Sequence, residues 1–267
     1  MRITDSQIHL HRPGQETRAA KVGQRFLQAH EALREMDEAG VNRAVIVAGA
    51  TESNEVALAA AAAHPDRFAV MGAVNLSKPE SREMIKTWTS HPGMRGIRLS
   101  FPPWREVSWL SDGTADWIWP AAGALGIPIM LWPPDQLEHL ARVAQTWPQT
   151  KLIVDHLGLY VDVTDDEVTA KIRPLIDLAK YPNVSVKLSA LPCHSTQAYP
   201  YHNLHQPIRD VIEAFGARRA YWGTDLTRLR GTYREAVTMF TEELGFLSDE
   251  DLEWVMGRGI SSILGWE

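Results

Sequence analysis

Residues 2–11, RITDSQIHLH, carry acidic, amide and imidazole side chains at alternating positions of one short segment. If the segment is a β-strand, Asp5, Gln7 and His9 point to one face, because successive strand residues alternate sides. His11 has the same phase but is expected in the following loop. Imidazole and carboxylate groups on one face can bind a divalent metal or activate water. Gln7 weakens the metal interpretation, because an amide oxygen is a poor zinc ligand beside imidazole.

Residues with similar chemical capacity stand near the ends of other apolar runs. They are Arg98 in RGIRLS, Trp132 in IPIMLW, Asp155 and His156 in KLIVDHLG, Lys187 in NVSVKLSA and Asp225 in RAYWGTD. Carboxylates and imidazoles exchange protons, whereas guanidinium and ammonium groups bind anions. These groups can act together only if the fold brings the ends of the runs to one place.

Eight short apolar runs alternate with amphipathic segments along the whole chain. The runs cover residues 2–10, 43–49, 68–75, 95–100, 127–132, 151–158, 183–190 and 219–225. Alternating strands and helices form parallel βαβ units, and eight units favour a closed barrel. The glycine-rich turn of a dinucleotide-binding sheet does not follow the first run. We predict one α/β domain over residues 1–267, a single-domain (β/α)8 TIM barrel with its site at the carboxyl ends of the strands.

Three helix ends can be placed from the sequence. Gly40 is expected to end the helix before the second run, and Asn54 to cap the alanine-rich helix over 55–63. Ser248 and Asp251 have the spacing of a capping box. Each expectation depends on side chains or backbone conformations that satisfy the free backbone groups of a helix end.

The composition is that of a globular protein. The 267 residues are 45% hydrophobic and 22% charged, with a net charge of −6. No basic surface for nucleic acid and no apolar run long enough to cross a membrane is expected. We expect a cytoplasmic enzyme with a small-molecule substrate; the oligomeric state, including a homo-oligomer, stays open. The single cysteine, Cys193, excludes a disulfide within the chain and a thiolate zinc cluster.

Several motifs resemble one family. DSQIHL is similar to the first-strand D-x-H-x-H motif of the amidohydrolase superfamily, VDHLG to its sixth-strand histidine motif, and YWGTD to its terminal aspartate motif. VSVKLSAL and GRGISSILGW resemble the amidohydrolase-2 branch, which includes 2-pyrone-4,6-dicarboxylate lactonase, sugar lactonases, sulfomuconolactone hydrolase and several decarboxylases. The resemblance covers essentially the whole chain, and it implies a (β/α)8 barrel and a hydrolase.

The resemblance also shows which residues would be expected to bind a metal ion. Metal-dependent members of the superfamily bind the ion through both first-strand histidines, in some groups a fifth-strand histidine, and the last aspartate. Gln7 and Trp132 stand at two of these positions. We predict an enzyme without a cofactor, as one lactonase of this architecture is. The alternative is one Zn or Mn ion, held by His9, His156 and Asp225.

Three residues are the expected catalytic groups. Asp225 would act as the base that activates water, and its simpler role would be to pair with Arg228 or to cap a helix. His156 and His9, with the amide of Gln7, would donate hydrogen bonds to the carbonyl oxygen that gains charge. His156 could instead be a core histidine that is satisfied by backbone groups.

The expected substrate-binding residues are Gln7, Arg98, Lys187, Trp132, Trp104, His194 and Tyr199. Arg98 and Lys187 would hold a carboxylate of the substrate, or would only balance Asp155 and Asp225. Trp104 would form an apolar wall. His194 and Tyr199 belong to the loop over 191–207, which is either a lid that contacts substrate or a proline-braced surface loop.

The leading functional prediction is a hydrolase that opens a lactone or similar activated ester of a small carboxylated compound. The degradation of aromatic compounds is one possible origin of such a substrate. The alternatives are a decarboxylase or carbon–carbon lyase of the same superfamily, and a metal-dependent hydrolase of the amidohydrolase-2 branch. A further alternative, from another class of protein, is a barrel that has no catalytic activity and binds a small ligand or a partner protein.

Overall fold

A computed structural model describes residues 1–21, 23–49, 53–101 and 109–267. Its eight strands are β1 Thr4–Ile8, β2 Arg43–Val47, β3 Phe68–Ala73, β4 Met94–Ser100, β5 Ile129–Trp132, β6 Leu152–Val154, β7 Val184–Leu188 and β8 Ala220–Trp222. Each strand pairs in parallel with the next, in the order β1 to β8. The predicted single-domain (β/α)8 barrel is confirmed as a nearly closed barrel of eight parallel strands.

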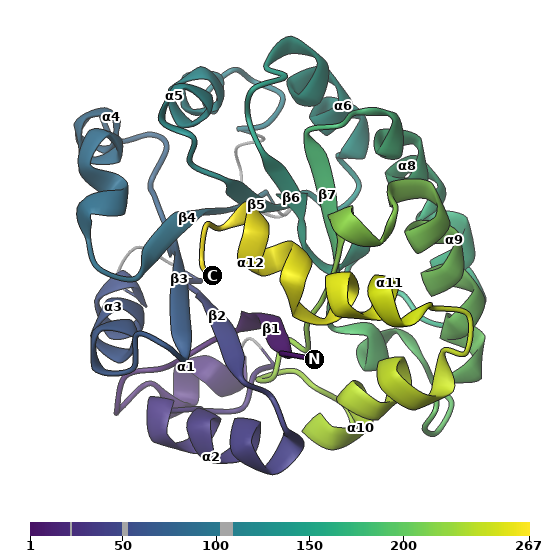
Figure 1. The fold of residues 1–267 in the computed structure, drawn as a ribbon. Coiled ribbons are helices and arrows are strands. Elements are labelled where there is room, and N and C mark those ends of the chain that lie inside the picture. The colour runs from purple at the N-terminus through teal and green to yellow at the C-terminus, as the bar shows by residue number, and fades with distance from the viewer. Residues whose placement is uncertain (22, 50–52, 102–108) are drawn as a thin grey trace.

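Helices surround the strands on the outside, except for α12, which lies across one end of the barrel (Figure 1). They are α1 Glu16–Lys21, α2 Ala29–Ala39, α3 Asn54–Ala63, α4 Glu80–Met84, α5 Ile118–Leu125, α6 Leu137–Thr146, α7 Asp166–Lys171, α8 Arg173–Ile176, α9 His205–Phe215, α10 Tyr233–Thr238, α11 Asp249–Glu253 and α12 Gly259–Ile263. Two π-helical turns, Met239–Glu243 and Trp254–Arg258, follow α10 and α11. None of the described helices is long and apolar enough to cross a membrane.

The core has two parts. The larger part lies between the strands and the surrounding helices, where one face of each strand packs on a helix. The smaller part fills the barrel interior with side chains such as Val45, Met71 and Met130, and it continues to Leu264 and Trp266. Helix α12 crosses the barrel opening in Figure 1, which is the opening at the amino ends of the strands. The opposite opening, at the carboxyl ends, is the one left for a site.

Two of the three predicted helix ends are confirmed. Gly40 ends α2 in the left-handed conformation (φ 80°), and Ser248 Oγ accepts a hydrogen bond from the Asp251 amide, 3.2 Å away. The prediction for Asn54 is wrong, because its side chain does not cap α3. The Asn54 amide instead bonds the backbone N and O of Ala73, both at 2.8 Å, and so ties α3 to the carboxyl end of β3.

Asp5 joins the first strand to the last. Its Oδ1 accepts hydrogen bonds from the backbone N atoms of Gln7 (2.9 Å) and Thr224 (3.0 Å). Its Oδ2 accepts from Thr224 Oγ1 (2.5 Å) and from the Tyr233 hydroxyl (2.7 Å). The β1 and β8 backbones approach so closely that a Cβ on Gly223 would lie 2.5 Å from Ser6 Oγ. The buried Asp5 carboxylate therefore links β1 to the residues after β8 where the barrel closes.

The Asp5→Ala variant tests this closure. We expect its free energy of unfolding to fall by about 3–5 kcal/mol, because several buried donors lose their acceptor. The Tyr233→Phe variant removes only one of these donors and should cost about 1 kcal/mol. Urea denaturation followed by circular dichroism measures both changes. A loss below about 1 kcal/mol for Asp5→Ala would contradict the role of Asp5.

Candidate active site

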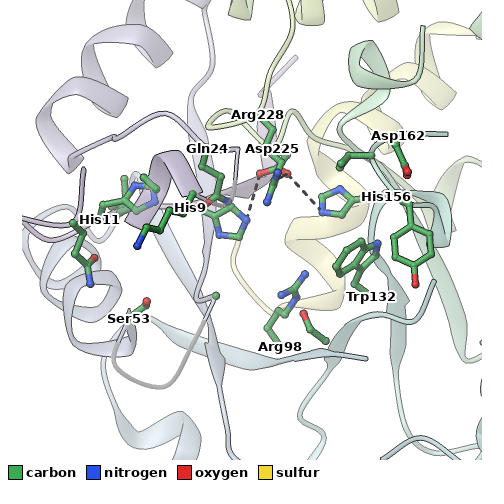
Figure 2. Close-up of a pocket in the computed structure, with 18 residues that line it drawn as sticks. His9, His11, Gln24, Ser53, Arg98, Trp132, His156, Asp162, Asp225 and Arg228 are labelled. Carbon is green, nitrogen blue, oxygen red and sulfur yellow. Dashed lines mark ion pairs between the residues drawn. The ribbon is translucent and has the colours of Figure 1, made fainter. Parts of the chain in front are cut away.

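A cavity of about 700 Å³ opens at the carboxyl ends of the strands. Its deep part is formed by His9, Arg98, His156, Asp225 and Arg228, which come from or directly after β1, β4, β6 and β8. Figure 2 shows Asp225 between the two histidines, with Arg98 on the opposite side of the cavity. Three predicted catalytic residues thus meet at one place, although their motifs are far apart in the sequence.

Asp225 is the centre of this group. Its Oδ1 lies 3.3 Å from His9 Nε2, and its Oδ2 lies 3.8 Å from His156 Nε2 and 3.6 Å from Arg228 Nε. Its backbone N donates to Gln7 O at 2.9 Å, which fixes the residue against β1. Although Asp225 is buried, Oδ1 accepts no hydrogen bond within the part of the chain that the structure describes. A carboxylate whose oxygen receives no hydrogen bond is a stronger base than one that is fully hydrogen-bonded.

Asp225 and His156 lie on turns just after their strands. The sequence-based strands over 151–158 and 219–225 are too long, because β6 ends at Val154 and β8 at Trp222. His156 has φ 52° and Asp225 has φ 53°, values that are uncommon for residues other than glycine. Such strained backbone is held in place by its surroundings and is frequent at functional sites.

His9 is a neutral histidine with a defined tautomer. Its Nδ1 lies 2.6 Å from Val47 O, and a carbonyl oxygen can only accept, so Nδ1 carries the hydrogen. Burial lowers the pKa of His9, against the opposing effect of Asp225, and Arg98 lowers it further. Its Nε2, which faces Asp225, also lies 3.3 Å from Gln7 Nε2.

His156 is held by Ser189 and Trp132. Its Nδ1 lies 2.9 Å from Ser189 Oγ, which also accepts a hydrogen bond from the His156 backbone N at 3.3 Å. The Trp132 ring meets the imidazole edge to face, with 6.5 Å between centroids. Burial lowers the pKa of His156 well below its ordinary value, although Asp225 acts in the opposite direction. The imidazole is therefore neutral near pH 7.

A buried charge network forms the floor of the cavity. Lys187 Nζ lies 3.0 Å from Asp155 Oδ1, and Arg98 Nε lies 3.2 Å from Asp155 Oδ2. Burial lowers the pKa of Lys187, but the adjacent Asp155 carboxylate opposes this effect. Lys187 also donates to the Gln7 side chain. Lys187 and Gln7 are fully buried beneath the cavity and do not line it, so direct contact with substrate, as expected from the sequence, does not fit their positions.

The first strand does not keep a simple alternation. Its pairing with β2 shifts register between Asp5 and Ile8. A bulge of this kind redirects side chains. Asp5 consequently faces the barrel seam, Gln7 lies under the cavity, and His9 enters it, although all three share a phase in the sequence.

Other expected binding residues lie outside the cavity or outside the described residues. His194 is buried, with Nδ1 2.7 Å from Val163 O, and Tyr199 donates to Thr238 Oγ1 at 2.9 Å. Neither residue lines the cavity, because the loop over 191–207 bonds to the outer layer of the barrel instead of covering the site. Trp132 does line it. Trp104 lies outside the described residues.

The sequence did not indicate several cavity residues. Arg228 was considered only as a partner of Asp225, yet its guanidinium also lines the cavity. Lys21 and Gln24 come from the segment between β1 and α2, and Tyr160 follows the β6 turn. The length of the connection from β1 to α2 was the available signal, since long loops at the catalytic face often contact substrate.

The residues that would hold a divalent metal do not fit one well. The hydrogens of Gln7 Nε2 point toward the His9 Nε2 lone pair that a metal would need. The Arg228 guanidinium stands 3.6 Å from Asp225 Oδ2, on the carboxylate that would be the charged ligand. Among the described residues, no group of three or more His, Cys, Asp or Glu side chains is arranged to hold an ion.

Comparisons with known proteins agree with this architecture. The chain is 28% identical over 205 residues to the L-fucono-1,5-lactonase of Burkholderia ambifaria, which covers 73% of this chain and 68% of the relative. An amidohydrolase of Burkholderia multivorans with bound zinc has the same fold (TM-score 0.85, 19% identity, 99% of each chain covered). The 5-carboxyvanillate decarboxylase of Sphingomonas paucimobilis also shares it (TM-score 0.73, 15% identity, 99% of each chain covered).

At these identities, the two solved structures show only that the fold is shared. One of them is a decarboxylase, whereas the relative from Burkholderia ambifaria is a lactonase. The family model is more specific. The amidohydrolase model matches residues 4–258, which include the strand ends that carry His9, His156 and Asp225. The resemblance seen in the sequence motifs is thereby confirmed, and the chain belongs to the amidohydrolase family.

Proposed function

We propose that this amidohydrolase opens a lactone of a small carboxylated compound, without a metal, by water that Asp225 activates. The observation that carries the proposal is the Asp225 carboxylate, which lines the cavity between two neutral histidines and whose buried Oδ1 has no hydrogen-bond partner among the described residues. The similarity to a sugar lactonase supports lactone hydrolysis as the reaction class.

In this mechanism, water hydrogen-bonded to Asp225 attacks the lactone carbonyl carbon while its proton passes to the carboxylate. The carbonyl oxygen becomes an oxyanion. His156 can donate to it from Nε2 if the Ser189 hydroxyl donates to Nδ1. The ring oxygen then leaves as the carbon–oxygen bond breaks, and it takes the proton back from Asp225. Water is consumed, and a hydroxy acid is the product.

Two arginines support the recognition of a carboxylate. Arg98 uses Nε to bond Asp155, and its terminal nitrogens have no bonding partner in the described part of the chain. Arg228 faces the same cavity, with Nε on the Asp225 side. Guanidinium groups bind carboxylates through paired hydrogen bonds. A substrate with a carboxylate beside its lactone ring would use these free donors.

The Asp225→Asn variant tests the base. We expect kcat to fall about 1,000-fold with KM within about threefold, because an amide cannot take a proton from water. A panel of 1,4- and 1,5-lactones, which includes L-fucono-1,5-lactone, provides the substrates. The Asp249→Asn variant changes an exposed carboxylate of α11 and should keep the wild-type kcat. Unchanged turnover of Asp225→Asn would remove Asp225 from the mechanism.

Product analysis separates hydrolysis from decarboxylation, the other reaction found on this fold. In oxygen-18 water, hydrolysis places one labelled oxygen in the new carboxylate of the product. Release of carbon dioxide from a carboxylated substrate, with its ring intact, would favour the decarboxylase alternative.

The Arg228→Met variant tests carboxylate recognition. For a carboxylated lactone we expect KM to rise about 10- to 100-fold, since a charged hydrogen bond contributes about 1.5–3 kcal/mol. For a lactone without a carboxylate, the change in KM should be less than about threefold. Arg234→Met, an exposed change on α10, is the matched control. Equal effects on both lactones would show that Arg228 does not read the carboxylate.

Removal of metal tests the cofactor prediction. After dialysis against a chelator, we expect kcat to stay within about twofold of its value before treatment, because the catalytic groups need no ion to activate water. Metal analysis by mass spectrometry of protein purified without chelator should find less than one ion per chain. Activity that is lost on chelation and restored by zinc or manganese would establish a metal enzyme.

A further inference from the structure

Gln7 stands where the superfamily motif has a histidine, yet it neither lines the cavity nor reaches solvent. It lies between Lys187 of β7 and His9 at the end of β1. The proposed mechanism gives this buried amide no role. Its two ends differ chemically, since the oxygen accepts hydrogen bonds and the nitrogen donates two. Its orientation therefore has consequences for both neighbours.

Lys187 determines that orientation. The Lys187 ammonium contacts three acceptors, which are Gln7 Oε1, Asp155 Oδ1 at 3.0 Å and Met130 Sδ at 3.5 Å. An ammonium group paired with a carboxylate can only donate. The reversed amide would direct two donors at each other in a buried site, which costs the energy of unmade hydrogen bonds. Gln7 Oε1 therefore faces Lys187, and Nε2 faces His9.

The Gln7 amide in turn determines whether His9 presents a hydrogen or a lone pair to Asp225. The Val47 carbonyl, 2.6 Å away, requires the His9 hydrogen on Nδ1, and Gln7 Nε2, 3.3 Å away, requires an acceptor at Nε2. Both constraints select the same neutral tautomer. In that tautomer His9 cannot donate to Asp225 Oδ1, which lies 3.3 Å from Nε2. This buried carboxylate oxygen therefore has no hydrogen-bond donor among the described residues, although an imidazole is beside it.

We propose that Gln7 is a positioning residue that holds His9 in the Nδ1–H tautomer, so that His9 does not donate a hydrogen bond to Asp225 Oδ1 and the carboxylate keeps its basicity. This inference rests on the proposed hydrolysis for its catalytic consequence, but the tautomer is a property of the free protein. Lys187 and Asp155 fix the orientation of the Gln7 amide. The amide selects the tautomer of His9, and in that tautomer His9 does not donate a hydrogen bond to Asp225.

The hydrogen-bonding ends of the side chain at position 7 can be changed without changing its size. A glutamate would accept at both ends. Beside His9 it would require a hydrogen on Nε2, and that hydrogen would also be within reach of Asp225. The Gln7→Glu variant keeps the size and shape of the side chain while it reverses the hydrogen bond.

Nitrogen-15 NMR of histidine-labelled enzyme tests the tautomer without substrate, with the His9 signals assigned by comparison with His9→Gln. In the wild type we expect a protonated Nδ1 and an unprotonated Nε2. In Gln7→Glu we expect both nitrogens to be protonated, together with a fall in kcat of about 100-fold and KM within about threefold. The new carboxylate lies beside Lys187, so we expect the thermal melting temperature to be retained.

Gln7→Met provides a second variant that has no charge and no hydrogen-bonding groups. We expect a smaller loss of kcat than in Gln7→Glu, because Val47 alone then selects the tautomer. A wild-type His9 with a protonated Nε2 would overturn the proposal, as would Gln7→Glu with unchanged spectra and kcat. If the wild type shows the expected tautomer but hydrolyses no lactone, the proposed function fails and the effect of Gln7 on His9 stands.

Discussion

The buried ion pair between Lys187 and Asp155 is the interaction on which the site depends. The two side chains are fully buried and 3.0 Å apart, and neither charge would be tolerated there alone. Asp155 also holds Arg98 at 3.2 Å, which leaves the rest of the guanidinium for the cavity. Lys187 holds Gln7, and through it His9. One charge pair thus orients groups on both sides of the cavity before any substrate arrives, which is the preorganisation that catalysis requires.

The second constraint is the closure of the barrel between β1 and β8. Asp5 gathers donors from Gln7, Thr224 and Tyr233, and the backbone of Asp225 bonds Gln7 O at 2.9 Å. The seam therefore fixes the base and the amide in one unit. The left-handed backbone of Asp225 persists because this unit determines its position. The same few residues stabilise the barrel and position Asp225. A change in Asp5 would therefore affect both the stability of the fold and the geometry of the site.

The sequence predicted the fold well because barrel architecture depends on hydrophobic period and on strand number, which are local and repeated signals. It also predicted that His9, His156 and Asp225 lie close together, because the carboxyl ends of the strands in a barrel meet at one opening. It did not predict what depends on a register shift or on a turn. The pairing of β1 shifts register beside Gln7, and both Gln7 and Lys187 lie too deep in the barrel to line the cavity. Arg228 was underestimated because its neighbour Asp225 offered a simpler partner.

The same geometry supports the proposal that the site works without a metal. Arg228 lies 3.6 Å from Asp225, the carboxylate that would hold a metal together with His9 and His156. A divalent ion bound to that carboxylate would be close to the positive guanidinium and would be repelled by it. An anionic substrate meets attraction from the same guanidinium. The positive charge that opposes a metal would thus favour the carboxylate of the proposed substrate, in agreement with the proposed roles of Gln7 and His9 in a site without a metal.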